Sequence, residues 1–185
     1  TELGIEQIKN KYNWSVTFFH MQYRNQLVLT GMINDVGAYT RTNIPNSYRA
    51  GIELQGAAFF NKWFNASANL ALSRNKVKQF TEYLDDYDNG GQKTIRYASA
   101  DIAYSPAIVG STALNFIPSG KIEISLLSKY VSKQYLDNTE NDNRSLDAFF
   151  VNDLRTIYTL KGKKRRELSI IAQLNNLLNI KYEPN

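Results

Sequence analysis

The chain of 185 residues contains no cysteine and a single histidine, His20. The absence of cysteine excludes disulfide scaffolds, thiol catalysis and metal sites built on thiolates. One histidine also excludes a site with several imidazole ligands from this chain alone, so we expect no metal and no cofactor. No apolar run approaches the roughly 20 residues that a membrane-spanning helix requires. The sequence therefore does not encode a helical membrane protein.

Motifs of catalysis and of phosphate binding are missing as well. No G-x-S-x-G pattern provides a nucleophilic serine for His20, which is interpreted as structural or interfacial. Gly51 and Gly56 have the spacing of a P-loop, but Ala57 and Ala58 stand in place of Lys and Ser/Thr. We therefore expect no catalytic residues and no enzymatic activity.

Two charged segments are also interpreted without a ligand. The acidic segment 82–91 lacks the ligand order of an EF-hand loop and is predicted to be a solvated loop tip, with Asn89-Gly90 at its turn. The basic run 161–166 has no aromatic platform beside it, so no nucleic-acid partner is expected.

The composition is that of a folded chain, with 43% hydrophobic and 12% aromatic residues and a mild net charge of +5. The first ten residues contain no initiating Met, no basic start, no apolar core and no cleavage site of a signal peptide. The chain is therefore interpreted as a part of a longer protein.

Alternation of apolar and polar residues with a period of two dominates the sequence. In 63–73 the even-numbered residues from Phe64 to Leu72 are apolar, whereas Asn65, Ser67 and Asn69 point to the opposite face. Clear strands are also predicted over 51–60, 121–130 and 167–175, and weaker ones over 2–8, 13–23, 107–117 and 149–160. The pattern predicts about eight strands and no helix.

The predicted connections alternate between short and long. Short turns are expected at 9–11, 61–62, 118–120 and 161–165, and long polar loops at 24–47, 74–103 and 131–147. Tight turns at one end and long loops at the other are typical of outer-membrane barrels, whose strands need about 9–11 residues to cross the hydrocarbon layer. The sequence therefore predicts an all-β, antiparallel up-and-down transmembrane β-barrel segment.

Each face of such a wall has a predicted role. Aromatic residues near the strand ends are expected to form the two interfacial girdles: Tyr12, Trp14, Trp63, Phe64, Tyr130, Tyr135, Phe149 and Phe150. Polar residues on the inward face are expected to line a wet lumen: Glu53, Gln55, Asn65, Ser67, Asn69, Glu123, Ser125, Lys129, Asp153 and Arg155.

Three segments resemble one family of barrels. The segment 36–80 contains an N…YRxGxE strand, a short turn and an aromatic-led strand, and 16–29 resembles the hairpin arm that precedes it. The segment 174–185 contains an NNLxNxxY pattern, and the residues that carry these motifs are Asn46, Tyr48, Arg49, Gly51, Glu53, Trp63, Phe64, Asn75, Asn175, Asn176, Leu177, Asn179 and Tyr182. They resemble the late barrel of TonB-dependent outer-membrane receptors, in particular those of Bacteroidetes.

This resemblance implies a fold and a function. Such receptors have a barrel of about 22 strands around an N-terminal plug. They import scarce nutrients such as ferric siderophores, cobalamin, or glycans and peptides across the Gram-negative outer membrane. At about 23 residues per strand with its loop, about 22 strands need about 510 residues. Residues 1–185 would then be the C-terminal portion of the barrel, without the plug and without the last strand.

The resemblance also implies partners and ligand contacts. The partners would be the TonB energy-transducing complex, acting through the plug, the remainder of the barrel, a surface lipoprotein, and lipid and lipopolysaccharide. The extracellular loops would contact the ligand through Tyr39, Arg41, Tyr83, Tyr87, Arg96 and Asn138.

Two other functions remain open at this stage. A small eight-stranded outer-membrane barrel could serve as an anchor or adhesin, with its interior packed by side chains. A soluble β-sandwich could bind carbohydrate. The small, polar inward residues of 63–73 favour a wide barrel over a narrow one.

Overall fold

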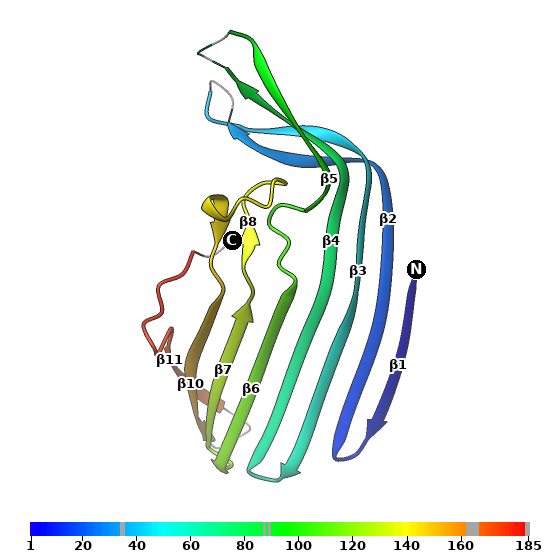
Figure 1. Ribbon diagram of the computed structural model, residues 1–185. Coiled ribbons are helices and arrows are strands. Elements are labelled where there is room, and N and C mark those ends of the chain that lie inside the picture. The colour runs from blue at the N-terminus through cyan, green and yellow to red at the C-terminus, as the bar shows by residue number, and fades with distance from the viewer. Residues whose placement is uncertain (34–35, 87, 89, 162–166, 184–185) are drawn as a thin grey trace.

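The computed structural model describes residues 1–33, 36–86, 88, 90–161 and 167–183, and these form one curved antiparallel sheet (Figure 1). Its order is β1-β2-β3-β4-β6-β7-β10-β11, with β5 also paired to β4. The bounds are Glu2–Lys9 (β1), Tyr12–Ile33 (β2), Tyr39–Asn61 (β3), Phe64–Asp85 (β4), Gln92–Asp101 (β5), Ile108–Ser119 (β6), Ile122–Val131 (β7), Phe149–Lys161 (β10) and Glu167–Leu174 (β11). The predicted all-β antiparallel fold is confirmed.

β5 and β6 together occupy one strand position. The upper part of β4 pairs with β5, from Lys76 opposite Asp101 onwards, and its lower part pairs with β6, up to Leu72 opposite Ile108. Segment 102–107 interrupts this strand but stays attached to β4, because Ile102 N donates to Asn75 O and Ser73 N donates to Ala107 O. The described sheet therefore has the eight strand positions that the sequence predicts.

The predicted long loops 24–47 and 74–103 are wrong, because both segments are largely strand. β2 continues as far as Ile33 and β3 begins at Tyr39, so these two strands form one long hairpin. β4 and β5 form a second long hairpin. The period of two breaks in these segments because Asn25 and Gln79 adopt left-handed backbone angles, with φ of 53° and 58°. Such residues reset which face the following side chains occupy. Figure 1 shows β2, β3 and β4 bending over in their upper parts.

The other connections agree with the prediction where they are described. Short turns join β1 to β2, β3 to β4 and β6 to β7. Segment 131–147 is mainly irregular, with a small sheet of β8 (Gln134–Tyr135) and β9 (Ser145–Leu146) and a single 3-10 turn, η1 (Asp142–Arg144). Most of the predicted turn 161–165 lies outside the described residues. Among the described residues no helix is long and apolar enough to cross a membrane.

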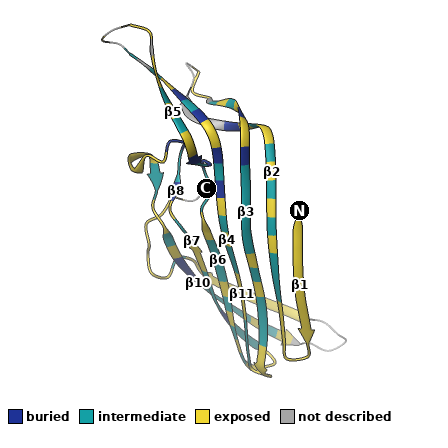
Figure 2. Ribbon diagram, turned by 45° about the vertical axis from the view of Figure 1, so that its right-hand side comes forward, coloured by how far each residue is buried: buried dark blue, intermediate teal, exposed yellow. Residues whose placement is uncertain are grey.

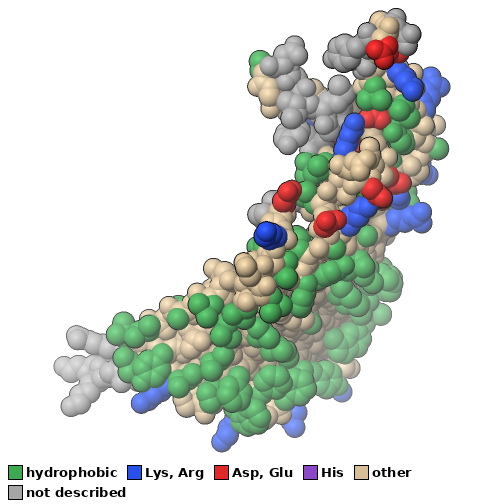
Figure 3. Space-filling view, turned by 60° about the vertical axis from the view of Figure 1, so that its left-hand side comes forward, with side chains coloured by type: hydrophobic (Ala, Val, Ile, Leu, Met, Phe, Trp, Pro, Cys, Tyr) green, Lys and Arg blue, Asp and Glu red, His purple; other side chains and the backbone are tan. Residues whose placement is uncertain are grey.

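The lower half of the sheet, at the end with the short turns, has one apolar face. The register aligns Val16, Leu54 and Leu70 across β2, β3 and β4, and Leu114 and Leu126 across β6 and β7. Figure 3 shows this face as a continuous hydrophobic surface. A polar pair also lies on it, where Ser128 Oγ donates to Asn152 Oδ1 at 2.6 Å.

The upper half of the sheet, by contrast, has a small hydrophobic core. Val28 and Ile44 of the β2–β3 hairpin pack with Val77, Phe80, Ala100 and Ile102 of the β4–β5 region, and Tyr97 packs against them. Figure 2 shows the buried residues gathered in the upper parts of these strands.

The two outer strands of the sheet, β1 and β11, are at opposite ends of the strand order and do not pair with each other in the described residues. Every residue of both strands is exposed. A closed eight-stranded barrel requires that pairing, and a sandwich requires a second large sheet on one face. The described residues provide neither feature, so the structure favours a segment of a wider barrel.

Candidate functional site

The polar face of the lower half is concave. A cavity of ≈ 520 Å³ extends across β2, β3, β4, β6, β7 and β10, and its lining includes Gln55, Asn69, Ser111, Lys129 and Asp153. Because one cavity is lined by residues from six neighbouring strands, the sheet must curve toward this face. The register places all ten predicted lumen residues, from Glu53 to Arg155, on this concave face.

Polar side chains of this wall bond to one another across the strands. Asn69 Nδ2 donates to Ser111 Oγ at 2.8 Å, and Asn115 Nδ2 donates to Asn65 Oδ1 at 2.8 Å. Such a surface suits water or another polar protein surface, because each group is either paired or open to solvent.

An aromatic cluster lies beside the short turns on the apolar face. The rings of Trp63 and Phe116 meet edge to face with centroids 5.5 Å apart, and Phe60 stacks on Phe64 at 5.2 Å. Tyr12 and Trp14, each 39% exposed, continue this row on β2. At the other boundary Tyr130 and Phe150 are paired on neighbouring strands.

Two predicted girdle members lie elsewhere. Phe149 is paired with Val131, which places it on the concave face, where its ring stacks on Tyr182 at 4.6 Å. Tyr135 is in the short strand β8, which belongs to the separate two-stranded sheet and not to the large one. These two assignments are wrong, because adjacent strand residues point to opposite faces and because β7 ends at Val131.

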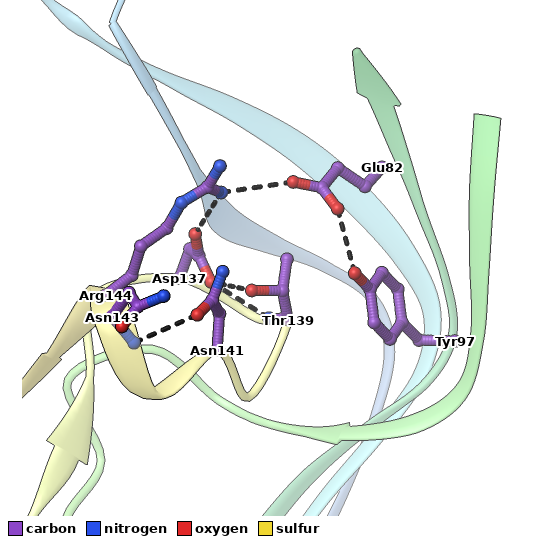
Figure 4. Close-up of polar contacts among 7 residues, drawn as sticks. All are labelled: Glu82, Tyr97, Asp137, Thr139, Asn141, Asn143 and Arg144. Atoms are coloured by element: carbon purple, nitrogen blue, oxygen red, sulfur yellow. Dashed lines mark hydrogen bonds and ion pairs between the residues drawn. The ribbon is translucent and has the colours of Figure 1, made fainter. Parts of the chain in front are cut away.

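A charged network joins segment 132–148 to the β4–β5 hairpin (Figure 4). Arg144 donates to Asp137 Oδ2 at 2.8 Å and to Glu82 Oε1 at 3.1 Å, and the Tyr97 hydroxyl donates to Glu82 Oε2 at 2.9 Å. Asp137 and Glu82 are buried. The Asp137 bond raises the pKa of Arg144, and burial together with the Glu82 bond raises the pKa of Tyr97.

A second ionic cluster lies beside it. Lys76 Nζ is 2.9 Å from Asp101 Oδ1 and 2.6 Å from Glu140 Oε1, which also accepts the backbone N–H of Asp101 at 2.7 Å. Burial alone would raise the pKa of Glu140, but the Lys76 and Asp101 bonds lower it. Both clusters therefore hold segment 132–148 on β4 and β5.

The predicted ligand contacts are distributed over several elements. Tyr83 and Arg96 are both exposed and lie on the same face of the β4–β5 hairpin, because Tyr83 pairs with Thr94 and Arg96 with Thr81. Arg41 is exposed on β3, in the other hairpin, and Tyr39 is the first residue of β3. Tyr87 lies outside the described residues.

Asn138 differs from the others because it is 0% exposed. Its Oδ1 accepts the backbone N–H of Ala103 at 2.8 Å, so it fixes the segment 132–148 to the interruption between β5 and β6. A ligand would reach Asn138 only after that segment moved.

Sequence reasoning missed the buried network. Glu82 is predicted to lie in a solvated loop tip, which is wrong, because it belongs to β4 and is 8% exposed. The signal that could have placed it is the alternation of Phe80, Glu82 and Leu84, which restarts after Gln79. In the part of the chain that the structure describes, no three acidic or imidazole side chains gather as a metal site.

A curved antiparallel sheet with an apolar outer face, a polar concave face and aromatic boundaries defines the wall of an outer-membrane β-barrel. The chain matches the family model for "TonB dependent receptor-like, beta-barrel" over residues 1–177 and belongs to this family. It is thus an outer-membrane protein of Gram-negative type, in a family of receptors rather than enzymes.

Solved structures show the same fold. The siderophore receptor PiuA from Acinetobacter baumannii is 17% identical, with a TM-score of 0.70 over 98% of this chain and 24% of that one. The copper transporter OprC is 15% identical, with a TM-score of 0.69 over 98% of this chain and 25% of that one. The ferric enterobactin receptor PfeA from Pseudomonas aeruginosa is 19% identical, with a TM-score of 0.61 over 96% of this chain and 25% of that one.

This chain spans about a quarter of the length of those structures. No curated protein matches it. In outer-membrane barrels the short turns face the periplasm and the long loops face the outside of the cell. The lower end of the sheet is therefore periplasmic, and the bent upper half is extracellular.

Proposed function

We propose that residues 1–185 form the C-terminal portion of the barrel of an active transport receptor that takes up a scarce nutrient. The observation that carries this proposal is the concave polar wall, whose ≈ 520 Å³ cavity spans six strands on the face opposite the apolar surface. An anchor with a packed interior has no use for such a wall, whereas a wide lumen that holds a polar plug requires one.

The route of uptake follows from the two ends of the wall. The nutrient binds at the extracellular mouth, and the TonB complex supplies energy through a plug region that lies within the lumen. No covalent chemistry is involved. Further partners are the remainder of the barrel, a surface lipoprotein, and the lipid and lipopolysaccharide around the apolar face.

The substrate class is a ferric siderophore, cobalamin, or a glycan or peptide. Two of the similar structures are named as siderophore or ferric enterobactin receptors, and one as a copper transporter. The pair Tyr83 and Arg96, together with Arg41, offers an aromatic ring and guanidinium groups, which suit an anionic chelate.

The test uses the full-length receptor in a Gram-negative host with its TonB complex. Cells receive a radiolabelled ferric hydroxamate, a ferric catecholate, cyanocobalamin or a malto-oligosaccharide, with and without a protonophore. We expect one probe to accumulate, and the protonophore to abolish accumulation while surface binding persists. Accumulation that the protonophore does not reduce, or binding without accumulation of any probe, would contradict active transport.

The same cells test the ligand contacts. For the accumulating probe, Tyr83→Ala and Arg96→Ala should each weaken surface binding about 10-fold, the effect of one lost hydrogen bond to a charged group. Lys93→Ala is the matched control, because Lys93 is exposed on the same strand and points to the other face of the hairpin. Equal effects of Lys93→Ala and Arg96→Ala would contradict the assignment.

A further inference from the structure

The short turns carry a row of exposed lysines. Lys9 and Lys11 flank the β1–β2 turn, Lys62 lies in the β3–β4 turn, and Lys121 lies in the β6–β7 turn. The described residues of these three turns include no Asp or Glu, and all five ion pairs found in the described chain lie in the upper half. Within the described residues, these four lysines therefore have no acidic partner.

Backbone hydrogen bonds fix the turns along one rim. Phe59 N donates to Lys11 O, Ile117 N to Trp63 O and Thr159 N to Lys121 O, each at 2.7 Å. Each bond joins a turn to the next hairpin, so the lysines recur about every 10 Å, the width of two strands. Figure 3 shows Lys and Arg side chains along the lower edge of the hydrophobic surface.

This rim lies next to the aromatic boundary. Lys62 precedes Trp63, and Lys9 Nζ is 5.7 Å from the centroid of the Tyr12 ring. Aromatic girdles mark the depth of the lipid headgroups. The lysine ammonium groups are therefore placed at headgroup depth, just beyond the hydrocarbon layer on the periplasmic side.

We propose that this lysine rim binds the phosphate groups of anionic phospholipids, such as phosphatidylglycerol, in the periplasmic leaflet. The charge is of one sign, and the surface continues directly into the lipid-facing face. An acidic protein partner is less well supported, because the lysines follow the membrane boundary and do not gather in a concave pocket. The inference goes beyond nutrient uptake and depends only on the orientation of the barrel.

The test uses the full-length receptor in phosphatidylcholine vesicles with spin-labelled phosphatidylglycerol or spin-labelled phosphatidylcholine as the probe. Electron paramagnetic resonance measures the association of each probe with the protein surface. We expect a preference for phosphatidylglycerol of about 5-fold, the effect of roughly one lysine near an anionic lipid. The preference should fall toward equality at about 1 M salt, where charges are screened within a few ångströms.

Two matched variants separate charge from shape. Lys9→Gln/Lys11→Gln/Lys62→Gln/Lys121→Gln should reduce the preference, and the same four positions changed to Arg should keep it. Heat-modifiable migration in gels checks that each variant is folded. If the fourfold variant does not fold, the single variant Lys62→Gln and the salt series on the unmodified receptor test the proposal instead. A preference that is insensitive to salt, or equal in the Gln and Arg sets, would overturn the proposal. Equal association of both probes with the unmodified receptor would also overturn it and would make an acidic polypeptide the better occupant.

Discussion

The lower and upper halves of this sheet share strands β2, β3 and β4 but differ in the exposure of their apolar side chains. In the lower half, Phe18 and Phe116 are 49% and 41% exposed on the outer face. In the upper half, Val77 and Phe80 are 0% and 1% exposed inside a core made by two hairpins. The difference indicates that lipid covers the first region and protein covers the second.

Charges divide along the same boundary. In the described residues, all ion pairs lie in the upper half, where Lys76, Lys133 and Arg144 pair with acidic residues: Asp101, Glu140, Asp142, Asp137 and Glu82. The lysines of the lower rim have no acidic partner among the residues that the structure describes. A region fixed by internal contacts and a region that depends on its surroundings should therefore respond differently to substitution.

The largest expected effect separates the two faces of the lower half. Leu70→Arg should destabilise the intact receptor by about 2–4 kcal/mol, because it places a charge on the lipid face near the bilayer midplane. Asn69→Arg, on the adjacent concave face, should have a mild effect. Refolding titrations in detergent–lipid mixtures measure both, and equal losses would remove the distinction between the faces.

The next effect concerns a close packing position in the lower half. A Cβ on Gly51 would lie 2.3 Å from Leu72 O and 2.7 Å from the Phe19 ring, which is paired directly across from it. Gly51→Ala should therefore cost about 1–3 kcal/mol through overpacking. Gly56→Ala is the control, because its nearest contact is Asn13 O at 3.6 Å. The same titration compares them, and similar costs would contradict the steric explanation.

A smaller effect is expected for the network of the upper half. Arg144→Gln removes the ion pairs of the buried carboxylates Asp137 and Glu82, and we expect a loss of about 1–2 kcal/mol, because Arg144 is partly solvated. The loss should appear as faster hydrogen exchange in segment 132–148, with the lower strands unchanged. Lys133→Gln is the control, since its partner Asp142 is exposed. Faster exchange spread over the whole sheet would show that the two halves are not independent.

The smallest effect is a dependence on pH. The folded-state pKa of Glu140 lies below its ordinary value of 4.5, so its contacts with Lys76 and Asp101 stabilise the docked segment at neutral pH. This stabilisation should be lost as the pH falls from the ordinary value of 4.5 through the lower folded-state pKa, because the carboxylate is then protonated. Hydrogen exchange of 132–148 over the acidic range measures it, and Glu140→Gln should remove the step. A step at neutral pH would point to another group.

The sequence predicted the lower half well because lipid on one side and water on the other impose a strict period of two. All eight strand positions, the lumen residues such as Asn69 and Lys129, and most girdle residues follow from that alternation. The family resemblance agreed with it, through the motif residues around Gly51 and Trp63.

The upper half could not be predicted in the same way. There the left-handed residues Asn25 and Gln79 shift the alternation, and contacts distant in sequence decide burial. Arg144 bonds to Glu82, 62 residues away in the sequence, and the buried Asn138 accepts the backbone N–H of Ala103, 35 residues away. Asn176 shows the same limit: its side-chain amide bonds both N and O of Ile180, which explains part of the NNLxNxxY motif only once the fold is known.

The central claim, that one wall is lipid-facing outside and polar inside, is tested most directly by spin labels at each position from 64 to 73 in the membrane-inserted receptor. Accessibility to oxygen and to a water-soluble nickel chelate is measured for each label. We predict that oxygen accessibility peaks at Phe64, Ala66, Ala68, Leu70 and Leu72 and is low at the residues between them. The opposite phase, or no alternation, would contradict the account.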